Sequence, residues 1–239
     1  MHSFLHTIAH HCSAIAIILI LLVTSVDINC FQSSFYAQQY EQLNTASRLQ
    51  LSEDDLMKAT NVLLDYLRTE KDNCDVTIVQ DGVSKEAFNQ KEKTHMIDVR
   101  NLYEFALNLR FVSMIVLIIS FVYLFLYDHH IPWFSLASAF IKISIVFGMF
   151  LAFLGIWAYV DFNAFWTMFH EVCFTNDLWL LNPATDLMIN LFPSPVFSAL
   201  VFKIIFSFVI PFVGLFIGSL VYVIRKVKVG HQNEKINFS

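Results

Sequence analysis

Two histidines lie in polar segments of a strongly apolar chain and are candidates for acid–base chemistry. His95 opens the segment HMIDVR, and His170 is the second residue of a polar insert that reads FHEVCFTNDLWLLNPATDLMINLFP over residues 169–193. A neutral imidazole can take up a proton near pH 7 and return it, as a general acid–base catalyst must. The alternative is structural: His95 would belong to a solvated helix start, and His170 to an aromatic belt at the membrane surface.

Other polar side chains in these two segments are candidates for orienting a histidine or donating hydrogen bonds. Asp98 follows His95 by three residues, so on a helix the two share a face and the carboxylate would fix the imidazole tautomer. Arg100 and Asn176 are candidate donors to a developing negative charge. Asn176 and Trp179 would donate hydrogen bonds into a cleft or, alternatively, anchor the insert at the membrane interface.

The later part of the insert predicts a short helix. Asn182 and Pro183 suit its start, because asparagine caps helices and proline fits the first helical turn. Asp186 would then lie near the positive end of the helix dipole. Its role is either to support that dipole or to make a hydrogen bond with a site residue.

Metal binding and thiol chemistry are not expected. The two histidines, Asp98 and Asp177 carry ligand atoms, but their spacing matches no metal-site signature. The four cysteines form no CxxC pair, and the three that would share one side of a membrane do not make a disulfide framework. The sequence therefore predicts no metal and no cofactor.

The elements that position these residues are predicted to be membrane helices. Hydrophobic residues make up 56% of the 239-residue chain, and its 25 phenylalanines exceed what a soluble core of this size needs. A bilayer core of roughly 30 Å requires about 20 apolar residues per helix. Four stretches meet or nearly meet this length: residues 12–29, 111–127, 134–160 and 196–224. The first has the length of a secretory signal, but no basic residue precedes it and no good cleavage site follows, so we interpret it as a helix.

Basic residues predict the orientation of these spans. The tail after the fourth span carries Arg225, Lys226, Lys228 and Lys235, so the positive-inside rule places the C-terminus in the cytoplasm. Four spans then place the N-terminus there too, with both histidine segments outside. The predicted order is residues 1–30, cytoplasmic end and first span; 31–110, outer segment; 111–127, second span; 128–133, cytoplasmic loop; 134–160, third span; 161–195, outer insert; 196–224, fourth span; and 225–239, basic tail.

The outer segment predicts helices and one small hairpin. Ser52 followed by Asp55 is a capping-box variant that predicts a helix to Arg68, after a weaker helical stretch over residues 36–51. Two β-rich stretches, residues 75–80 and 83–88, flank an Asp-Gly turn and predict a hairpin. Helical patterning resumes near Met96 and continues into the second span. The predicted fold class is an all-α integral membrane protein with four transmembrane helices and an extracytoplasmic helical segment containing a small β-hairpin.

The two histidine segments carry a family resemblance. The strings THMIDVR and FHEVCFTNDLWLLNPATDLMINLFP, with four spans around them, closely resemble the lipoprotein intramolecular transacylase (Lit) family of low-GC Gram-positive bacteria. The family pattern has a His-Met-x-Asp-Val-basic segment and a Phe-His segment leading to Asn-x-x-Trp-x-Leu-acidic-Pro-x-x-Asp. The chain departs from it at Asn182, in the acidic position, and at Cys173, where an aromatic residue is common.

The resemblance implies an acyltransferase with His95 and His170 as catalytic residues. Such an enzyme moves the sn-2 acyl chain of a diacylglyceryl lipoprotein onto the α-amino group of its N-terminal cysteine, giving an N-acyl lyso-form lipoprotein. It would be a multi-pass protein of the bacterial cytoplasmic membrane, with its active site on the extracytoplasmic face. Its partners would be diacylglyceryl-modified lipoproteins and membrane lipid, with no nucleic acid and no obligatory protein partner.

Two other function classes remain open from the sequence. A membrane-embedded hydrolase would use the same histidines with water to cleave a lipid ester. A non-catalytic membrane partner or sensor would use the histidines to report pH. Product analysis separates the hydrolase, because hydrolysis releases a fatty acid that transacylation conserves. Loss of activity in histidine variants of normal expression separates the sensor.

Overall fold

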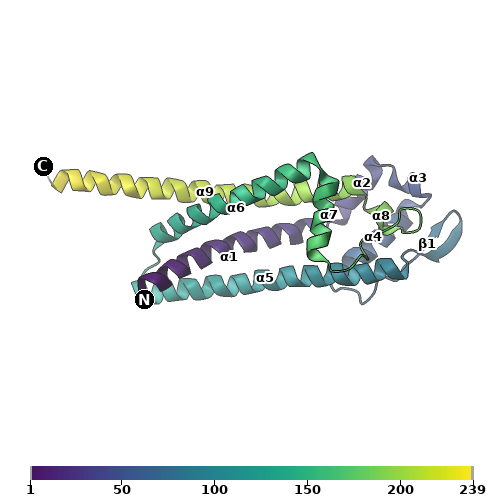
Figure 1. The fold of residues 1–239 in the computed structure, drawn as a ribbon, viewed down its shortest axis with the longest axis horizontal. Helices are drawn as coiled ribbons and strands as arrows, with labels where there is room; N and C mark the ends of the chain where they lie inside the picture. Colours follow the sequence, from purple (N-terminus) through teal and green to yellow (C-terminus); the bar gives the residue numbers. More distant parts are fainter. Residues whose placement is uncertain (1, 238–239) are drawn as a thin grey trace. The chain divides into compact units, whose positions relative to one another are not determined.

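The computed structural model, which describes residues 2–237, is mainly helical (Figure 1). Its chain divides into two compact units. The first takes the described residues up to Val26, then Leu107–Ile156, and then the chain from Ile204 onward. The second comprises Asp27–Ala106 and Trp157–Lys203.

Four helices have the length and apolar character to cross a membrane. Each contains an 18-residue window of mean hydropathy between 2.2 and 2.5 with at most two charged residues. The predicted fold class is thereby confirmed, although all four helices extend beyond the predicted spans, α6 by a single residue. They are α1 (His2–Cys30), α5 (Gln90–Asp128), α6 (Trp133–Val160) and α9 (Ser194–Asn237).

The first unit has a small apolar core. Ala14 and Ile18 of α1 pack against Phe140 of α6 and against Phe208 and Phe212 of α9, and all five side chains are buried. The two α9 rings are stacked, with centroids 5.1 Å apart. Many other apolar side chains of these helices are exposed, as expected for surfaces that face lipid tails rather than water.

The second unit contains the shorter helices. They are α2 (Ser33–Gln42), α3 (Thr45–Leu49), α4 (Glu53–Leu67), α7 (Phe162–Cys173) and α8 (Met188–Leu191). The predicted cap of α4 is confirmed, because Ser52 Oγ accepts a hydrogen bond from the Asp55 N–H at 3.0 Å. The weaker helical stretch predicted over residues 36–51 forms as two helices, because Asn44 adopts φ 48° between them. Asparagine tolerates this left-handed conformation better than most residues.

The predicted β-hairpin is confirmed. Strands β1 (Thr77–Gln80) and β2 (Val83–Glu86) pair in antiparallel register, from Thr77 opposite Glu86 to Gln80 opposite Val83. Asp81 and Gly82 both have positive φ, as a type I′ turn requires. An isolated ribbon of two strands is only marginally stable, but here Ile78 is fully buried and the Lys58 ammonium on α4 donates to the Thr77 carbonyl.

Helix α5 begins at Gln90, earlier than the predicted start near Met96, because a capping box fixes its first turn. Asn89 Oδ1 accepts from the Glu92 N–H at 3.1 Å, and Glu92 Oε2 accepts from the Asn89 N–H at 2.8 Å. The helix then runs unbroken for 39 residues. Seven charged residues between Gln90 and Arg110 keep this part of α5 out of hydrocarbon. The spanning part is therefore the apolar stretch that follows, and the histidine segment precedes it.

Candidate active site

The two candidate histidines lie on different helices of the second unit. His95 is in the second turn of α5, and His170 is near the end of α7. Helix α7 starts at an N-cap, since Asp161 Oδ1 accepts from the Ala164 N–H at 2.9 Å. From the sequence, this part of the insert was predicted only as a polar segment. Its helix signal was the aspartate cap followed by aromatic residues at helical spacing, Phe162, Phe165, Trp166 and Phe169.

The fold brings the two imidazole rings together. Their centroids are 6.1 Å apart, with 31° between the ring planes. Phe174, just after α7, contacts both rings, with centroid distances of 5.3 Å to His95 and 5.6 Å to His170. The pair therefore shares one apolar wall, and a group held between the rings would meet two nitrogen bases.

The tautomer of neutral His170 is fixed by its own helix. Its Nδ1 lies 2.7 Å from the Trp166 carbonyl oxygen, one turn earlier. A carbonyl oxygen only accepts, so Nδ1 carries the proton and the neutral ring presents the lone pair of Nε2. The rings of Trp166 and Trp179 lie 4.9 and 5.0 Å from the imidazole centroid. Burial among these groups lowers the pKa of His170, although its bond to Trp166 acts in the opposite sense.

His95 is more deeply buried, with 6% of its surface exposed. Burial first, and then the charge that His170 would carry, lower the pKa of His95 to about 4, while Asp98 acts in the opposite sense. The ring is therefore neutral at pH 7. Its Nδ1 is shielded from solvent and has no hydrogen-bond partner among residues 4–230. Because each charge opposes the other, the pair holds one proton much more readily than two.

The expected hydrogen bond from the His95 ring to the Asp98 carboxylate is not formed. Asp98 Oδ2 instead accepts from the Asn176 side-chain amide at 2.9 Å. The Asn176 carbonyl oxygen in turn accepts from the Leu178 N–H at 3.0 Å. Helical spacing places Asp98 on the same face as His95, but Asn176 of the insert donates to the Asp98 carboxylate instead. Asp98 and Asn176 thus connect α5 to the chain that follows α7, and Trp179 extends this connection by its contact with His170.

Arg100 is directed away from the histidine pair. Its Nε donates to Glu104 Oε1 at 3.1 Å, and its guanidinium carbon lies 4.9 Å from the centre of the Tyr66 ring on α4. Both contacts engage the Arg100 guanidinium, whose N–H groups would otherwise donate to a developing oxyanion. The structure therefore brings His95, His170, Asp98, Asn176 and Trp179 together and leaves Arg100 outside this cluster.

The helix predicted from Asn182 and Pro183 is absent from the described chain. Residues 182–187 form turns, and α8 begins only at Met188. Asp186 explains the difference, because its carboxylate accepts from the Asn182 N–H at 2.7 Å and from the Thr185 hydroxyl at 2.9 Å. Burial would raise the pKa of Asp186, but these bonds outweigh it and the pKa is lowered.

Glu92 is a positioning residue that the sequence analysis missed. It is only 1% exposed, and its Oε1 accepts from the Met188 N–H at 2.6 Å. The neighbouring Asn89 amide donates to Asp186 Oδ1 at 2.8 Å. Burial raises the pKa of Glu92, while the bonds from Met188 and Asn89 lower it, and burial prevails. Asparagine three residues before glutamate is a recognisable capping-box pattern, so the sequence did hold a signal for this pair.

A polar cavity of about 650 Å³ lies in the same unit. Its walls come from α3, the hairpin, the start of α5 and the insert, and include Arg48, Lys85, Glu92, Asp186 and Asn190. These groups offer charges of both signs and amide hydrogen bonds. Among the side chains of residues 4–230, no three histidine, cysteine or acidic groups lie closely enough together to hold a metal ion.

The fold and the site define an integral membrane protein whose polar unit holds a buried histidine, His95, beside a half-buried one, His170. Residues 11–197 match the family "Lipoprotein intramolecular transacylase Lit". The chain belongs to this family of acyltransferases, and the expected family and enzyme class are confirmed. No protein of curated function matches the chain.

Solved structures agree with the fold. The chain is similar to the membrane-integral lipoprotein intramolecular transacylase Lit from Bacillus cereus, with TM-score 0.75 and 16% identity, over 95% of this chain and 99% of that one. It is also similar to two variants of that enzyme in which one histidine is replaced. The arginine variant gives TM-score 0.69 and 15% identity, over 96% of each chain. The alanine variant gives TM-score 0.68 and 15% identity, over 95% of this chain and 97% of that one.

Proposed function

We propose that this protein moves the sn-2 acyl chain of a diacylglyceryl-cysteine lipoprotein to the α-amino group of the same cysteine. The product is an N-acyl lyso-form lipoprotein. The observation that carries the proposal is the pairing of His95 with His170, whose ring centroids are 6.1 Å apart in a family of acyltransferases. One ring serves as the base and then the acid, and the other as a hydrogen-bond donor.

His170 is the proton carrier in this scheme. A free α-amino group has a pKa of about 7.7 to 8.0, so roughly a tenth is neutral at pH 7 and can attack the ester. As the N–C bond forms, the nitrogen becomes acidic and gives its proton to the Nε2 lone pair of His170, whose Nδ1 proton is held by Trp166. The imidazolium then returns a proton to the glyceryl oxygen as the C–O bond breaks.

His95 stabilises the tetrahedral oxyanion in the same scheme. Its lowered pKa keeps the ring neutral, so one ring nitrogen always carries a proton to donate. One well-aimed donor is worth about 3 to 4 kcal/mol in such a step. Burial, which lowers the pKa of His170, also favours release of the His170 proton to the leaving oxygen. We therefore assign His170 as the base and His95 as the hydrogen-bond donor to the oxyanion.

The reaction balances without water or a covalent enzyme intermediate. One N–C bond forms, one C–O bond breaks, and one proton moves from nitrogen to oxygen. Because the amine and the ester belong to the same substrate, their effective concentration is high. The protein therefore needs only to align them, carry the proton and stabilise the oxyanion.

The substrate's peptide portion would occupy the polar cavity in the second unit. Its walls include the hairpin and Glu92, three residues before His95. The hairpin would close over the lipoprotein N-terminus. Deleting residues 75–88 should then impair the reaction, and undiminished activity would exclude this role. The basic tail and four apolar helices favour the bacterial cytoplasmic membrane, with the site on the extracytoplasmic face.

Mass spectrometry of a reporter lipoprotein tests the reaction. The reporter's N-terminal peptide would be recovered from a bacterial host that lacks N-acyltransferase and expresses the protein. We expect an N-acyl monoacylglyceryl peptide whose total mass is unchanged. His170→Ala should leave the diacylglyceryl form with a free amine, and His130→Ala, an exposed histidine between α5 and α6, should behave as wild type.

The same measurement separates the alternatives. Loss of one acyl mass with a free amine would identify a lipid-ester hydrolase. An unmodified reporter with the wild-type protein at normal expression would support a non-catalytic partner or sensor. Either result would overturn the proposed reaction.

A further inference from the structure

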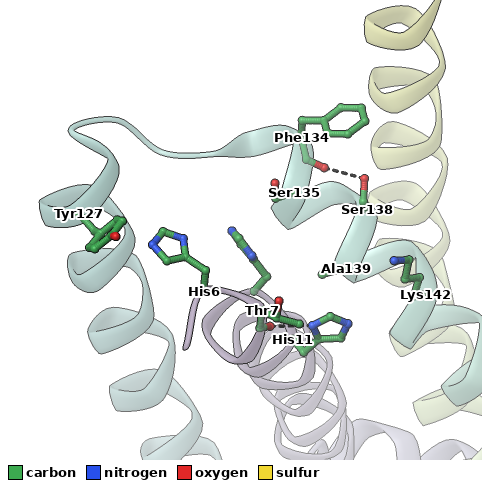
Figure 2. Close-up of a pocket in the computed structure, with 10 residues that line it drawn as sticks. His6, Thr7, His11, Tyr127, Phe134, Ser135, Ser138, Ala139 and Lys142 are labelled. Carbon is green, nitrogen blue, oxygen red and sulfur yellow. Dashed lines mark hydrogen bonds between the residues drawn. The ribbon is translucent and has the colours of Figure 1, made fainter. Parts of the chain in front are cut away.

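The first unit contains a cavity that the proposed reaction does not use. It has a volume of about 580 Å³ and lies where the first turns of α1 and α6 and the last turn of α5 meet. Figure 2 shows His6 and His11 of α1 on one side and Ser135, Ser138 and Lys142 of α6 on the other.

The walls of this cavity carry positive charge and hydrogen-bond donors. Lys142 supplies an ammonium, three histidines supply imidazoles, and none of the ten lining residues is acidic. Asp128 on α5 lies outside this lining; its Oδ2 is 3.8 Å from the ring Nδ1 of His6, and its charge also acts on His10. The cavity therefore favours an anion over a cation.

The histidines have hydrogen-bonding capacity that the fold leaves unused. His10 lines the cavity, is 9% exposed, and its Nε2 has no partner among the described residues. Nε2 of His6 is also shielded from solvent and has no partner among the described residues. His11 differs, because its Nδ1 is bonded to the Thr7 carbonyl at 2.7 Å and only its Nε2 remains for a ligand. Shielded polar atoms without partners are costly, so a ligand that bonds to them is stabilised.

The position of Lys142 indicates the chemical class of the anion. Lys142 lies within the apolar helix α6, which is long enough to span a membrane, and none of the ion pairs among the side chains of residues 4–230 includes it. A lysine in such a helix is costly unless its charge reaches the interface or a counter-ion. In the headgroup region of a bilayer the abundant anion is phosphate. A phosphate oxygen accepts bonds from ammonium, imidazole and hydroxyl groups alike.

We propose that the cavity formed by His6, His10, His11, Ser135, Ser138 and Lys142 binds the phosphate of a phosphate-bearing ligand, with an acidic membrane phospholipid as the principal source. The site is independent of the histidine pair of the second unit and of the reaction proposed there. Its function is to hold α1 and α6 together through a shared anion.

Lipid binding to the purified full-length protein tests this site. Delipidated protein in detergent would receive phosphatidylglycerol, diacylglycerol of the same chains, inorganic phosphate or Zn²⁺. Native mass spectrometry measures binding and thermal unfolding measures stabilisation. We expect phosphatidylglycerol, but not diacylglycerol, to bind and raise the melting temperature. Lys142→Gln should weaken binding by about tenfold, the effect of one lost charged hydrogen bond.

Matched variants keep the test decisive. Lys226→Gln removes an exposed lysine of α9 outside the cavity and should leave binding unchanged. His11→Gln removes a second lining group and should also weaken binding. Stabilisation by inorganic phosphate alone that Lys142→Gln abolishes would keep the phosphate site and assign it to a free phosphate. Equal binding by wild type and Lys142→Gln, equal binding of diacylglycerol, or stabilisation by Zn²⁺ only would overturn the proposal.

Discussion

The buried Glu92 carboxylate accepts the backbone N–H of Met188 at 2.6 Å and so joins the first turn of α5 to the insert after α7. Its other oxygen accepts the Asn89 N–H at the start of the same helix. Residues three apart on a helix share a face, so this connection lies next to His95. The position of His95 therefore depends on the Glu92 carboxylate, which does not contact His170.

Replacing Glu92 should both destabilise the second unit and lower the yield of N-acylated product. Glu92→Ala leaves the Met188 and Asn89 N–H groups unpaired, at a cost of about 1 to 3 kcal/mol each. Glu92→Gln retains an acceptor and should lose less than half as much. Thermal unfolding and the yield of N-acylated reporter measure the two effects. Glu53→Gln, an exposed acid in α4, is the control; equal losses in Glu92→Gln and Glu92→Ala would contradict this role.

The pH dependence of the reaction should follow the substrate amine rather than the histidines. Burial lowers the pKa of His170 and lowers that of His95 to about 4, so both rings are already neutral above pH 6.5. Activity should therefore fall about tenfold for each pH unit below the amine pKa, which is about 7.7 to 8.0. Initial rates between pH 6 and 8 check this. A separate step near pH 6.5 in the wild-type profile would contradict it.

Stability should change with pH in the direction set by His95. Its folded-state pKa is lowered to about 4 from the ordinary value of 6.5. Between these values the unfolded chain binds more protons than the folded one, so the free energy of unfolding increases as pH rises and this contribution is fully present above pH 6.5. Thermal unfolding of wild type and His95→Gln from pH 4 to 7 measures it. The variant should show a shallower dependence, and parallel curves would count against a buried, neutral His95.

The Asp98 and Asn176 side chains should act as one unit. Their hydrogen bond of 2.9 Å predicts that Asp98→Ala, Asn176→Ala and the double variant lose similar amounts of activity. The coupling energy should be about 1 kcal/mol, because the bond involves a charged group that remains partly solvated. A double-mutant cycle on reporter N-acylation gives this value. Additive losses, with Asp98→Ala much the larger, would instead favour direct orientation of His95 by Asp98.

Trp179 should control the protonation of His170. The indole lies 5.0 Å from the imidazole centroid and covers part of it. Trp179→Ala should admit water and raise the pKa of His170 towards its ordinary value, because burial is the main cause of the lowered pKa. Trp179→Phe keeps an aromatic cover and should change it less. An NMR titration of His170 in detergent measures both, and an unchanged titration in Trp179→Ala would exclude this role.

The sequence by itself determined the features that depend on local patterns. Apolar runs of spanning length predicted four membrane helices, because the bilayer requires them whatever their neighbours are. Ser52 with Asp55 and the Asp-Gly turn fixed a helix start and a hairpin through bonds within a few residues. The segments around His95 and His170 were sufficient to identify the family. The start of α5 was also within reach, since Asn89 and Glu92 form a local capping box.

Only the tertiary structure decided which of these side chains meet. Helical spacing put Asp98 on the same face as His95, yet the Asp98 carboxylate accepts a hydrogen bond from Asn176 of the insert. Arg100 lies in the same motif but turns to Glu104 and Tyr66. The helix expected at Asn182 is replaced by turns. Long-range partners compete with local preferences for the same donors and acceptors, and a buried group takes whichever partner removes it from water at the lower cost.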